Sequence, residues 1–382
     1  MSLSDHRLAP TALMLGNFVT GCTVLAPAGM LVELSRDFGV TIRDASLLIT
    51  FGAVILCIGS PLTAWLTGRF DRRLLLATTV AVMFAGNLAS AFTTNYTVLM
   101  VLRLATLAVA ALFTPQAAGT IGLIAPLEKR GGLIAYVFLG WSLAAAIGLP
   151  LISYVSSHLG WHIAYGGIAA IAAIVVALLL VALPRGVAGL PVDMKMWAEV
   201  LRNPLILLLL VITCLQIAGQ FAVYAFLGPL LVKLGGASPE SIAIFFATHG
   251  VMGFVGNVIA SRVVDRWGAY RSSLVWMVSL LLGAAIWSLG GGILPVMLVG
   301  AAIWGLGFAS TNSMQQVRLV GAAPSSAGAS VSLNTSVLYI GQGLGSAIGG
   351  ALFARELFAA QGYVAVAFLA AAVGVLLLTR RG

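Results

Sequence analysis

Charged residues are scarce in this sequence. Only 8% of its 382 residues are Asp, Glu, Lys or Arg, whereas soluble domains carry roughly 25%. Hydrophobic residues make up 60%, and the mean hydropathy is +1.08. A soluble protein of this length needs far more polar surface to cover its core. The composition therefore excludes a soluble globular protein and indicates an all-α membrane protein with many spans.

Residues that hold metals, cofactors or disulfides are also few. The three cysteines, Cys22, Cys57 and Cys214, all fall within apolar runs, which is typical of small buried core residues. No C-x-x-C pair and no metal-ligand spacing occurs, and the sequence has no disulfide framework. It also has no G-x-x-x-x-G-K-[ST] phosphate loop. We therefore expect no metal, no cofactor and no direct use of ATP.

The basic residues are distributed in a way that predicts orientation. The net charge is +9, but Lys and Arg occur as short clusters between apolar runs. If both termini are cytoplasmic, 15 of the 20 Lys and Arg residues lie on the cytoplasmic side and four lie opposite. This bias follows the positive-inside rule. It predicts cytoplasmic termini in a multi-pass protein, and it explains the basic charge without a nucleic-acid partner.

Twelve apolar runs are long enough to cross a bilayer, which takes about 20 residues as a helix. A polar segment, 184–203, divides them into two sets of six. We predict two six-helix bundles, residues 1–183 and 204–382, joined by a cytoplasmic linker at 184–203. The predicted spans lie near 12–34, 45–67, 74–92, 97–125, 133–156, 162–183, 204–233, 239–263, 272–290, 293–317, 327–354 and 359–379.

A small charged signature occurs twice, about half the chain apart. It reads "GSPLTAWLTGRFDRR" at 59–73 and "GNVIASRVVDRWGAYR" at 256–271. Each copy falls in the cytoplasmic loop after the second span of its half, so the chain is an internal repeat. Such repeats suit transporters in which two bundles rock about a central site. The charged residues expected at a cytoplasmic gate are Arg69, Asp71, Arg72, Arg73, Asp265, Arg266 and Arg271.

With these features, the sequence resembles the major facilitator superfamily over essentially its whole length. The two charged segments are similar to that family's G-x-x-x-D-R-x-G-R-R loop motif. Three further segments resemble its drug:proton antiporter and sugar-efflux (arabinose-efflux-like) group: "GMLVELSRDFGV", "GWSLAAAIGLPLISYVSSHLGW" and "SLNTSVLYIGQGLGSAIGGAL". The resemblance implies the major facilitator fold, a monomer in the bacterial cytoplasmic (inner) membrane, and export of drugs or sugars in exchange for protons.

Two positions depart from the family pattern. When Gly59 is aligned with the motif glycine, Gly68 stands where the family has its gating Asp. Asp71, three residues later, is then the candidate substitute, whereas the second copy keeps its acid as Asp265. The acid common in the first helix of this group would fall near Val24, so the usual proton carrier is absent.

Three residues are candidates for proton coupling. Arg103 lies within the fourth span, where the resemblance places the family's intramembrane arginine, and buried charges are costly enough to indicate function. The alternative is a structural pair with Glu33, near the outer end of the first span. His249 is near the middle of the eighth span, and no span carries an acid in its middle. It is then the mid-membrane group that titrates near neutrality, or a neutral histidine packed between helices.

Polar and aromatic residues near mid-membrane are candidates for binding the solute. Gln216, Gln220 and Tyr224 recur every fourth residue and share one helix face, as do Asn334 and Gln342. Hydrogen bonding between helices is the alternative for such residues. The full set of substrate-binding candidates is Asn17, Thr20, Arg103, Trp141, Gln216, Gln220, Tyr224, Phe245, His249, Trp304, Asn334 and Gln342.

These observations predict a secondary active transporter that exports a small organic solute, sugar-like or drug-like, by alternating access as a proton antiporter. An uptake permease or an uncoupled facilitator of the same fold is the alternative, because the first-helix acid is missing. A membrane enzyme is not expected, because the histidines at 6, 158, 162 and 249 are scattered and no acid lies at mid-membrane.

Overall fold

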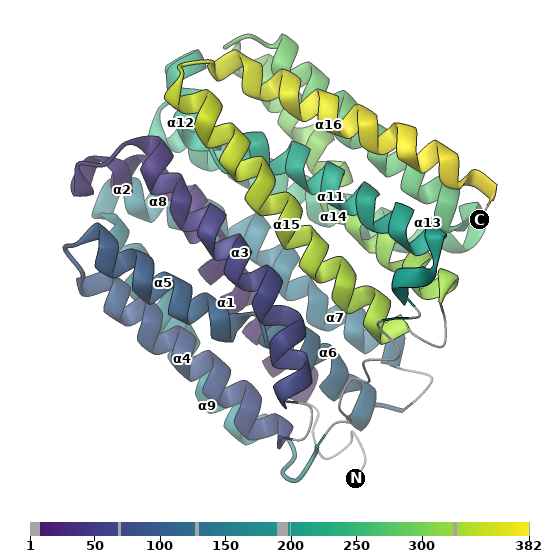
Figure 1. The fold of residues 1–382 in the computed structure, drawn as a ribbon. Coiled ribbons are helices and arrows are strands. Elements are labelled where there is room, and N and C mark those ends of the chain that lie inside the picture. Colours follow the sequence, from purple (N-terminus) through teal and green to yellow (C-terminus); the bar gives the residue numbers. More distant parts are fainter. Residues whose placement is uncertain are drawn as a thin grey trace.

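The protein is a bundle of long helices that lie side by side, with successive spans running in opposite directions (Figure 1). The computed structural model describes residues 8–67, 70–126, 130–188, 198, 200–323 and 327–381. Within these residues, twelve helical stretches are long and apolar enough to cross a membrane. The predicted all-α class and the number of spans are therefore confirmed, while the cytoplasmic placement of both termini stays a prediction.

The first six spans form what we call the N-half. Its helices are α1 (Ala9–Gly29), α2 (Leu31–Phe38), α3 (Ile42–Thr67), α4 (Arg72–Phe92), α5 (Tyr96–Ala110), α6 (Phe113–Ile124), α7 (Arg130–Leu143), a π-helical turn (Ala144–Gly148), α8 (Leu149–Leu159) and α9 (Trp161–Ala182).

The last six spans form the C-half. Its helices are α11 (Pro204–Tyr224), α12 (Leu227–Gly235), α13 (Pro239–Leu289), α14 (Leu294–Ala322), α15 (Ala327–Ala354) and α16 (Phe358–Leu378), followed by a 3₁₀ turn (Thr379–Arg381). Helix α13 contains two spans, which divide at Gly268, where φ is 76°. The proposed domain boundaries at 183 and 204 stay predictions.

The first and seventh spans are each broken near one end of the molecule. Predicted as continuous runs at 12–34 and 204–233, they instead divide at Met30 (φ −131°, ψ 21°) and Phe226 (φ −113°, ψ 15°). The short helices that follow, α2 and α12, end at left-handed Gly39 (φ 62°) and Gly236 (φ 61°). Apolar residues continue through both breaks, so hydropathy gives no sign of them. The internal repeat thus extends to matching breaks and turns.

We call the end that carries Gly39, Gly160 and Gly236 the outer end, following the predicted orientation. The helices that follow Gly39 and Gly236 each begin with a hydroxyl cap. Thr41 Oγ1 accepts a bond from the Asp44 N–H (3.0 Å), and Ser238 Oγ accepts one from the Ser241 N–H (3.3 Å). Such caps satisfy backbone donors that a helix start leaves unpaired.

The fifth span contains a π-helical turn at Ala144–Gly148, where the Leu149 N–H donates to the Ala144 carbonyl five residues earlier. Pro150 follows directly and has no N–H to continue an α-helical ladder. Turns of this kind frequently occur at functional sites. Here the turn presses against Gly250 of α13, where an added Cβ would overlap the Ala145 carbonyl and the Ala146 Cα. The two halves therefore meet backbone to backbone near mid-membrane.

The halves are joined along their outer parts. Helix α3 packs on α15, where Thr50 Oγ1 donates to Ser346 Oγ at 2.9 Å. Helix α8 packs on α13, where His158 Nε2 lies 3.0 Å from Glu240 Oε1. One buried apolar cluster spans both sides, because Leu25 and Ile49 of the N-half pack with residues of the C-half.

Candidate functional site

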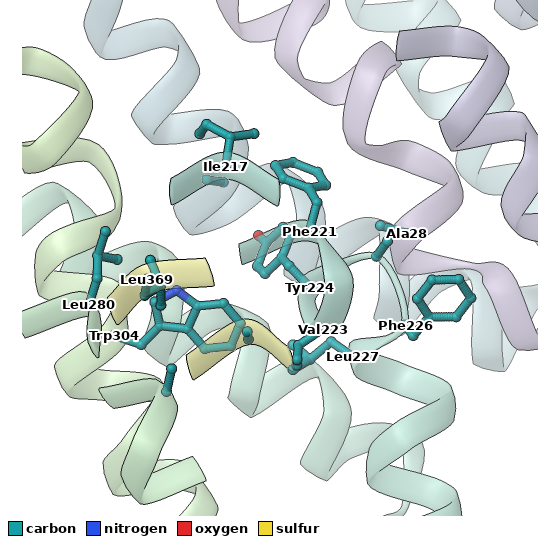
Figure 2. Packing of buried hydrophobic residues seen from close by; sticks show 14 of the residues in the cluster. Ala28, Ile217, Phe221, Val223, Tyr224, Phe226, Leu227, Leu280, Trp304 and Leu369 are labelled. Atoms are coloured by element: carbon teal, nitrogen blue, oxygen red, sulfur yellow. The ribbon is translucent and has the colours of Figure 1, made fainter. Parts of the chain in front are cut away.

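An aromatic cluster surrounds His249 in the C-half. The imidazole ring centre lies 4.8 Å from that of Tyr224, 5.3 Å from that of Trp304 and 4.8 Å from that of Phe308. These side chains come from α13, α11 and α14, and Figure 2 shows Tyr224 and Trp304 within the packed core. Trp304 also lies near Trp287, whose ring contacts Phe245. The structure therefore brings together four of the predicted binding residues.

The polar atoms of this cluster have no hydrogen-bond partner. Both ring nitrogens of His249, the Tyr224 hydroxyl and the Trp304 Nε1 are buried and unpaired among the described residues. The amides of Gln216 and Gln220, about two turns and one turn before Tyr224 on α11, are equally buried and unpaired. We name His249, Tyr224, Trp304, Gln216 and Gln220 the C-half polar cluster.

The unpaired atoms are energetically costly. A buried polar group without a partner costs roughly 1–3 kcal/mol, and native proteins keep only a few such groups. Here several unpaired polar groups lie on neighbouring helices, an arrangement whose cost is not explained by core packing alone. The arrangement offers amide, hydroxyl, imidazole and indole groups beside aromatic faces, so it can hydrogen-bond and stack on a polar guest.

The predicted binding residues of the N-half are already bonded to the protein. Trp141 Nε1 donates to Thr114 Oγ1 (3.0 Å), Thr114 donates to Asn17 Oδ1 (2.7 Å), and Asn17 Nδ2 donates to the Val137 carbonyl (3.0 Å). This chain ties α1, α6 and α7 together. Thr20 donates to the Gly16 carbonyl within its own helix (2.8 Å). These residues thus make interhelical and local bonds, and a binding role for them stays a prediction.

Two of the predicted binding residues, Asn334 and Gln342, lie on α15. Asn334 Oδ1 accepts a bond from Thr213 Oγ1 of α11 at 2.7 Å, so it contributes to helix packing. Gln342 is buried on the same helix. Small residues bring the two helices together, because Gly345 and Gly349 face backbone carbonyls of α11. A binding role for Asn334 and Gln342 stays a prediction.

Arg103 is buried, and its guanidinium bonds to three backbone carbonyls. Its guanidinium donates to Thr23 O (2.8 Å), Val24 O (2.7 Å) and Leu48 O (3.1 Å). Thr23 is four residues before Pro27, which has no N–H to offer that carbonyl. Arg103 therefore replaces the hydrogen bond that Pro27 removes and links α5 to α1 and α3. The alternative of an ion pair with Glu33 is wrong, because these carbonyls hold the guanidinium.

Glu33 lies on α2 at the outer end, beside a hollow of about 90 Å³ between the halves. Ser153 and Ser157 of α8 and Pro229 of α12 also line this hollow. The carboxyl group is half-buried, and burial raises its pKa above the ordinary value for glutamate. Glu33 is thus a protonatable group placed where the halves meet.

The first charged loop is tied to the central linker. Asp71 Oδ1 caps α4 by accepting from the Leu74 N–H (3.0 Å), and its Oδ2 accepts from the Gly186 N–H (2.5 Å). The Arg72 N–H donates to the Val187 carbonyl (2.8 Å), and its guanidinium bonds to Gln116 of α6. Asp71 thus bonds within the N-half and its linker in this structure, and its role as a substitute for the gating acid stays a prediction.

The other predicted gate residues are less constrained. Arg73 is half-buried, and Arg266 and Arg271 are exposed. Gly68 and Arg69 lie outside the described residues, as does the side chain of Asp265. Their gating role stays a prediction.

Comparison with known families decides the class of the molecule. The sequence profile of the Major Facilitator Superfamily matches residues 13–346. The chain belongs to the Major Facilitator Superfamily. It is therefore a multi-pass membrane transporter of small molecules and not an enzyme, as the resemblance implied.

Relatives within the superfamily cover nearly the whole chain. The inner membrane transport protein YdhP of Escherichia coli (strain K12) is 28% identical over 91% of this chain and 89% of its own. A probable sugar efflux transporter of Mannheimia succiniciproducens is 26% identical over 91% and 87%.

Solved structures of the superfamily share the fold. A D-xylose-proton symporter superposes with a TM-score of 0.75 at 17% identity, covering 95% of this chain and 97% of its own. The nucleoside transporter NupG (D323A mutant) gives 0.73 at 13% identity, covering 98% and 100%. At these identities the likeness concerns the fold alone.

Sequence analysis missed some members of the site. Phe308 and Trp287 complete the aromatic surroundings of His249 and Trp304. Phe308 was detectable, because it follows Trp304 by four residues and so shares its helix face. Gly250 was missed because it is one of 44 glycines, and only the packed structure shows which of them separates two backbones.

Proposed function

We propose that this transporter exports a small uncharged organic solute, sugar-like or drug-like, in exchange for protons across the bacterial cytoplasmic membrane, as a monomer. The observation that carries the proposal is the C-half polar cluster. Its buried, unpaired donors and acceptors lie beside aromatic rings on neighbouring helices. A guest that bonds to them removes the cost of leaving them unpaired.

The chemistry of the cluster favours a neutral guest. Its five members are amides, a phenol, an indole and an imidazole, and no carboxylate or ammonium group belongs to it. Binding an ion without a counter-charge at mid-membrane is costly. Hydroxyl groups of a sugar-like solute match the amides and the phenol, while one face of its ring stacks on Trp304 or Tyr224.

Alternating access follows from how the halves meet. The described contacts between them, at Thr50 with Ser346 and at His158 with Glu240, lie toward the outer end. Loss of these contacts would open the outer end to the solvent. Glu33, beside the hollow at this end, and His249, within the cluster, are the proposed proton-coupling groups, while Arg103 supports the helix break at Met30 that precedes Glu33.

Export is favoured over uptake by two observations. One full-length relative is named a probable sugar efflux transporter, and the fifth span resembles the antiporter pattern. The π-helical turn of that span lies against Gly250, the residue after His249. A movement of this turn would therefore be transmitted directly to the cluster.

A specific observation favours an uncoupled facilitator or uptake permease as the second candidate. Val24 stands where the related antiporters carry a first-helix acid, and its carbonyl is bonded to Arg103. If neither Glu33 nor His249 carries protons, transport simply follows the solute gradient.

The test is accumulation of labelled pentoses, nucleosides, cationic dyes and chloramphenicol-like drugs in cells with and without the protein. Each solute is measured with and without a protonophore. We expect lower accumulation of a neutral solute, reversed by the protonophore, and no effect on the cationic dyes. Higher accumulation, or indifference to the protonophore, contradicts proton-coupled export.

A matched pair of variants assigns the transport to the cluster. Trp304→Phe removes the indole N–H within it and should weaken transport. Trp276→Phe removes another buried, unpaired indole N–H from a separate small core group with Ala260 and Met314, and should leave transport intact. Equal effects of the two substitutions would contradict a binding role for the cluster.

A further inference from the structure

His158 forms an ion pair between the two halves at the outer end. It is the second-last residue of α8, and its Nε2 lies 3.0 Å from Oε1 of Glu240 in the first turn of α13. Their side chains are 34% and 56% exposed, so protons from the outer solution reach them. Neither residue belongs to the C-half polar cluster, and the proposed function uses them only as one contact between the halves, with no role in sensing protons.

The partners of the imidazole select its charged form. Nδ1 lies 2.9 Å from the Tyr154 carbonyl oxygen, which can only accept, and 3.0 Å from the Ser157 hydroxyl. Nε2 faces a carboxylate oxygen, which also accepts when ionised. A neutral histidine donates from one nitrogen only, whereas the imidazolium donates from both. The geometry is therefore satisfied in full when His158 is protonated.

The surroundings support the charged pair. The Tyr154 ring stacks on the imidazole at 4.2 Å, which favours a cation beside its face. Glu240 lies in the first turn of its helix, where a negative charge is favoured. Of the titratable groups near His158, the structure brings Tyr154 and Glu240 into contact with it. The elements packed at this end also carry Glu33, Arg36 and Asp37 on α2, His162 on α9 and Lys233 on α12.

We infer that His158 and Glu240 form a proton-sensing latch, which closes the outer end when the outer solution is acidic and releases it when His158 loses its proton. The inference rests on the proposed alternating access, because a latch needs an end that opens. The pair joins α8 directly to α13, next to the hollow lined by Glu33 and Ser157. Acid outside thus favours the conformation that faces the cytoplasm, where an exporter collects its solute.

The test measures opening of the outer end directly, without any solute. Cys22, Cys57 and Cys214 are replaced by alanine, and spin labels are attached at Thr94→Cys in the N-half and Arg355→Cys in the C-half, both exposed at the outer end. Pulsed electron paramagnetic resonance measures the distance between the two labels at acidic and alkaline pH. The ratio of short to long distances gives the ratio of molecules closed at the outer end to molecules open there. The same measurement is made for His158→Gln, Glu240→Gln, the double variant and His162→Gln.

We expect acid to raise the closed-to-open ratio of the parent protein. An exposed ion pair contributes little, so the response should fall about two- to five-fold in His158→Gln and equally in Glu240→Gln. The double variant should match either single one, because the two residues act as a pair. His162→Gln should keep the parent response, since that ring stacks on Trp161 within the N-half.

Other results contradict the latch in distinguishable ways. If two distances appear but His158→Gln leaves the pH response of their ratio unchanged, the latch is wrong while alternating access stands. If His162→Gln loses the response as His158→Gln does, the pair is not its source. A single distance at every pH contradicts the latch together with the proposed alternating access.

Discussion

At the scale of single residues, polar side chains in the described structure divide into those that hold helices together and those that are buried without a hydrogen-bond partner. Arg103, Asn17 and Asn334 use their polar atoms on backbone carbonyls or neighbouring side chains. His249 and Tyr224 leave theirs unpaired in the described structure. Sequence analysis grouped all five as binding candidates, because residue type and depth do not show which groups find partners.

Tyr224→Phe separates a binding role from a structural one. Because the buried hydroxyl has no partner, its removal should leave the melting temperature of the unliganded protein unchanged or slightly higher. The lost bond to solute, worth about 0.5–1.5 kcal/mol, should raise KM roughly two- to ten-fold. Thermal unfolding and transport kinetics check the two effects. A lower melting temperature with an unchanged KM would show that the hydroxyl is structural.

Glu33→Gln tests the proton carrier. Burial raises the pKa of Glu33 when the outer end is closed, so the closed conformation binds its proton more tightly than an open, hydrated one. Protonation therefore favours closure at low pH, and this preference is lost as pH rises through the raised pKa. We expect Glu33→Gln, which stays neutral, to flatten the pH profile of transport. Glu356→Gln changes an exposed acid at the same end, so it is the control and should keep the parent pH profile. A parent-like pH profile for Glu33→Gln would contradict a proton-carrying role for Glu33.

At the scale of elements, hydropathy was enough to predict the twelve spans, because each crossing needs a long apolar run. It could not predict where helices break. Apolar residues continue through Met30 and Phe226, and the breaks show only in their backbone angles. The π-helical turn at Ala144–Gly148 was equally hidden, although Pro150 beside it was a possible signal. The aromatic cluster required three helices to meet, which no single helix pattern specifies.

Gly250→Ala tests the contact between α13 and the π-helical turn. The added Cβ would overlap the Ala145 carbonyl, and overpacking of this kind costs about 1–3 kcal/mol. We expect the outer end to open more often, so that a cysteine at Ser153 reacts about tenfold faster with a membrane-impermeant thiol reagent. Gly253→Ala is the matched control, because its Cβ meets no atom closer than 3.4 Å. Equal labelling rates in the two variants would show that the contact between α13 and the π-helical turn does not hold the outer end closed.

At the scale of the whole molecule, the repeated halves meet toward the outer end, and the proposed solute site lies in one of them. The N-half contributes Arg103, Glu33 and the π-helical turn, while the C-half contributes the unpaired cluster. In the proposed mechanism the solute binds in the C-half, while protons act on Glu33 of the N-half, on His249 of the C-half and on the His158–Glu240 pair between them. Antiport follows if protons favour closure of the outer end and solute favours its opening.

The most direct test of this account is proton movement driven by solute in proteoliposomes that contain the purified protein and an enclosed pH indicator. A gradient of the transported neutral solute is imposed with no pH gradient present. Antiport predicts that protons move against the direction of the solute, and that Glu33→Gln weakens this flux. Protons moving with the solute, or solute moving without protons, would contradict antiport.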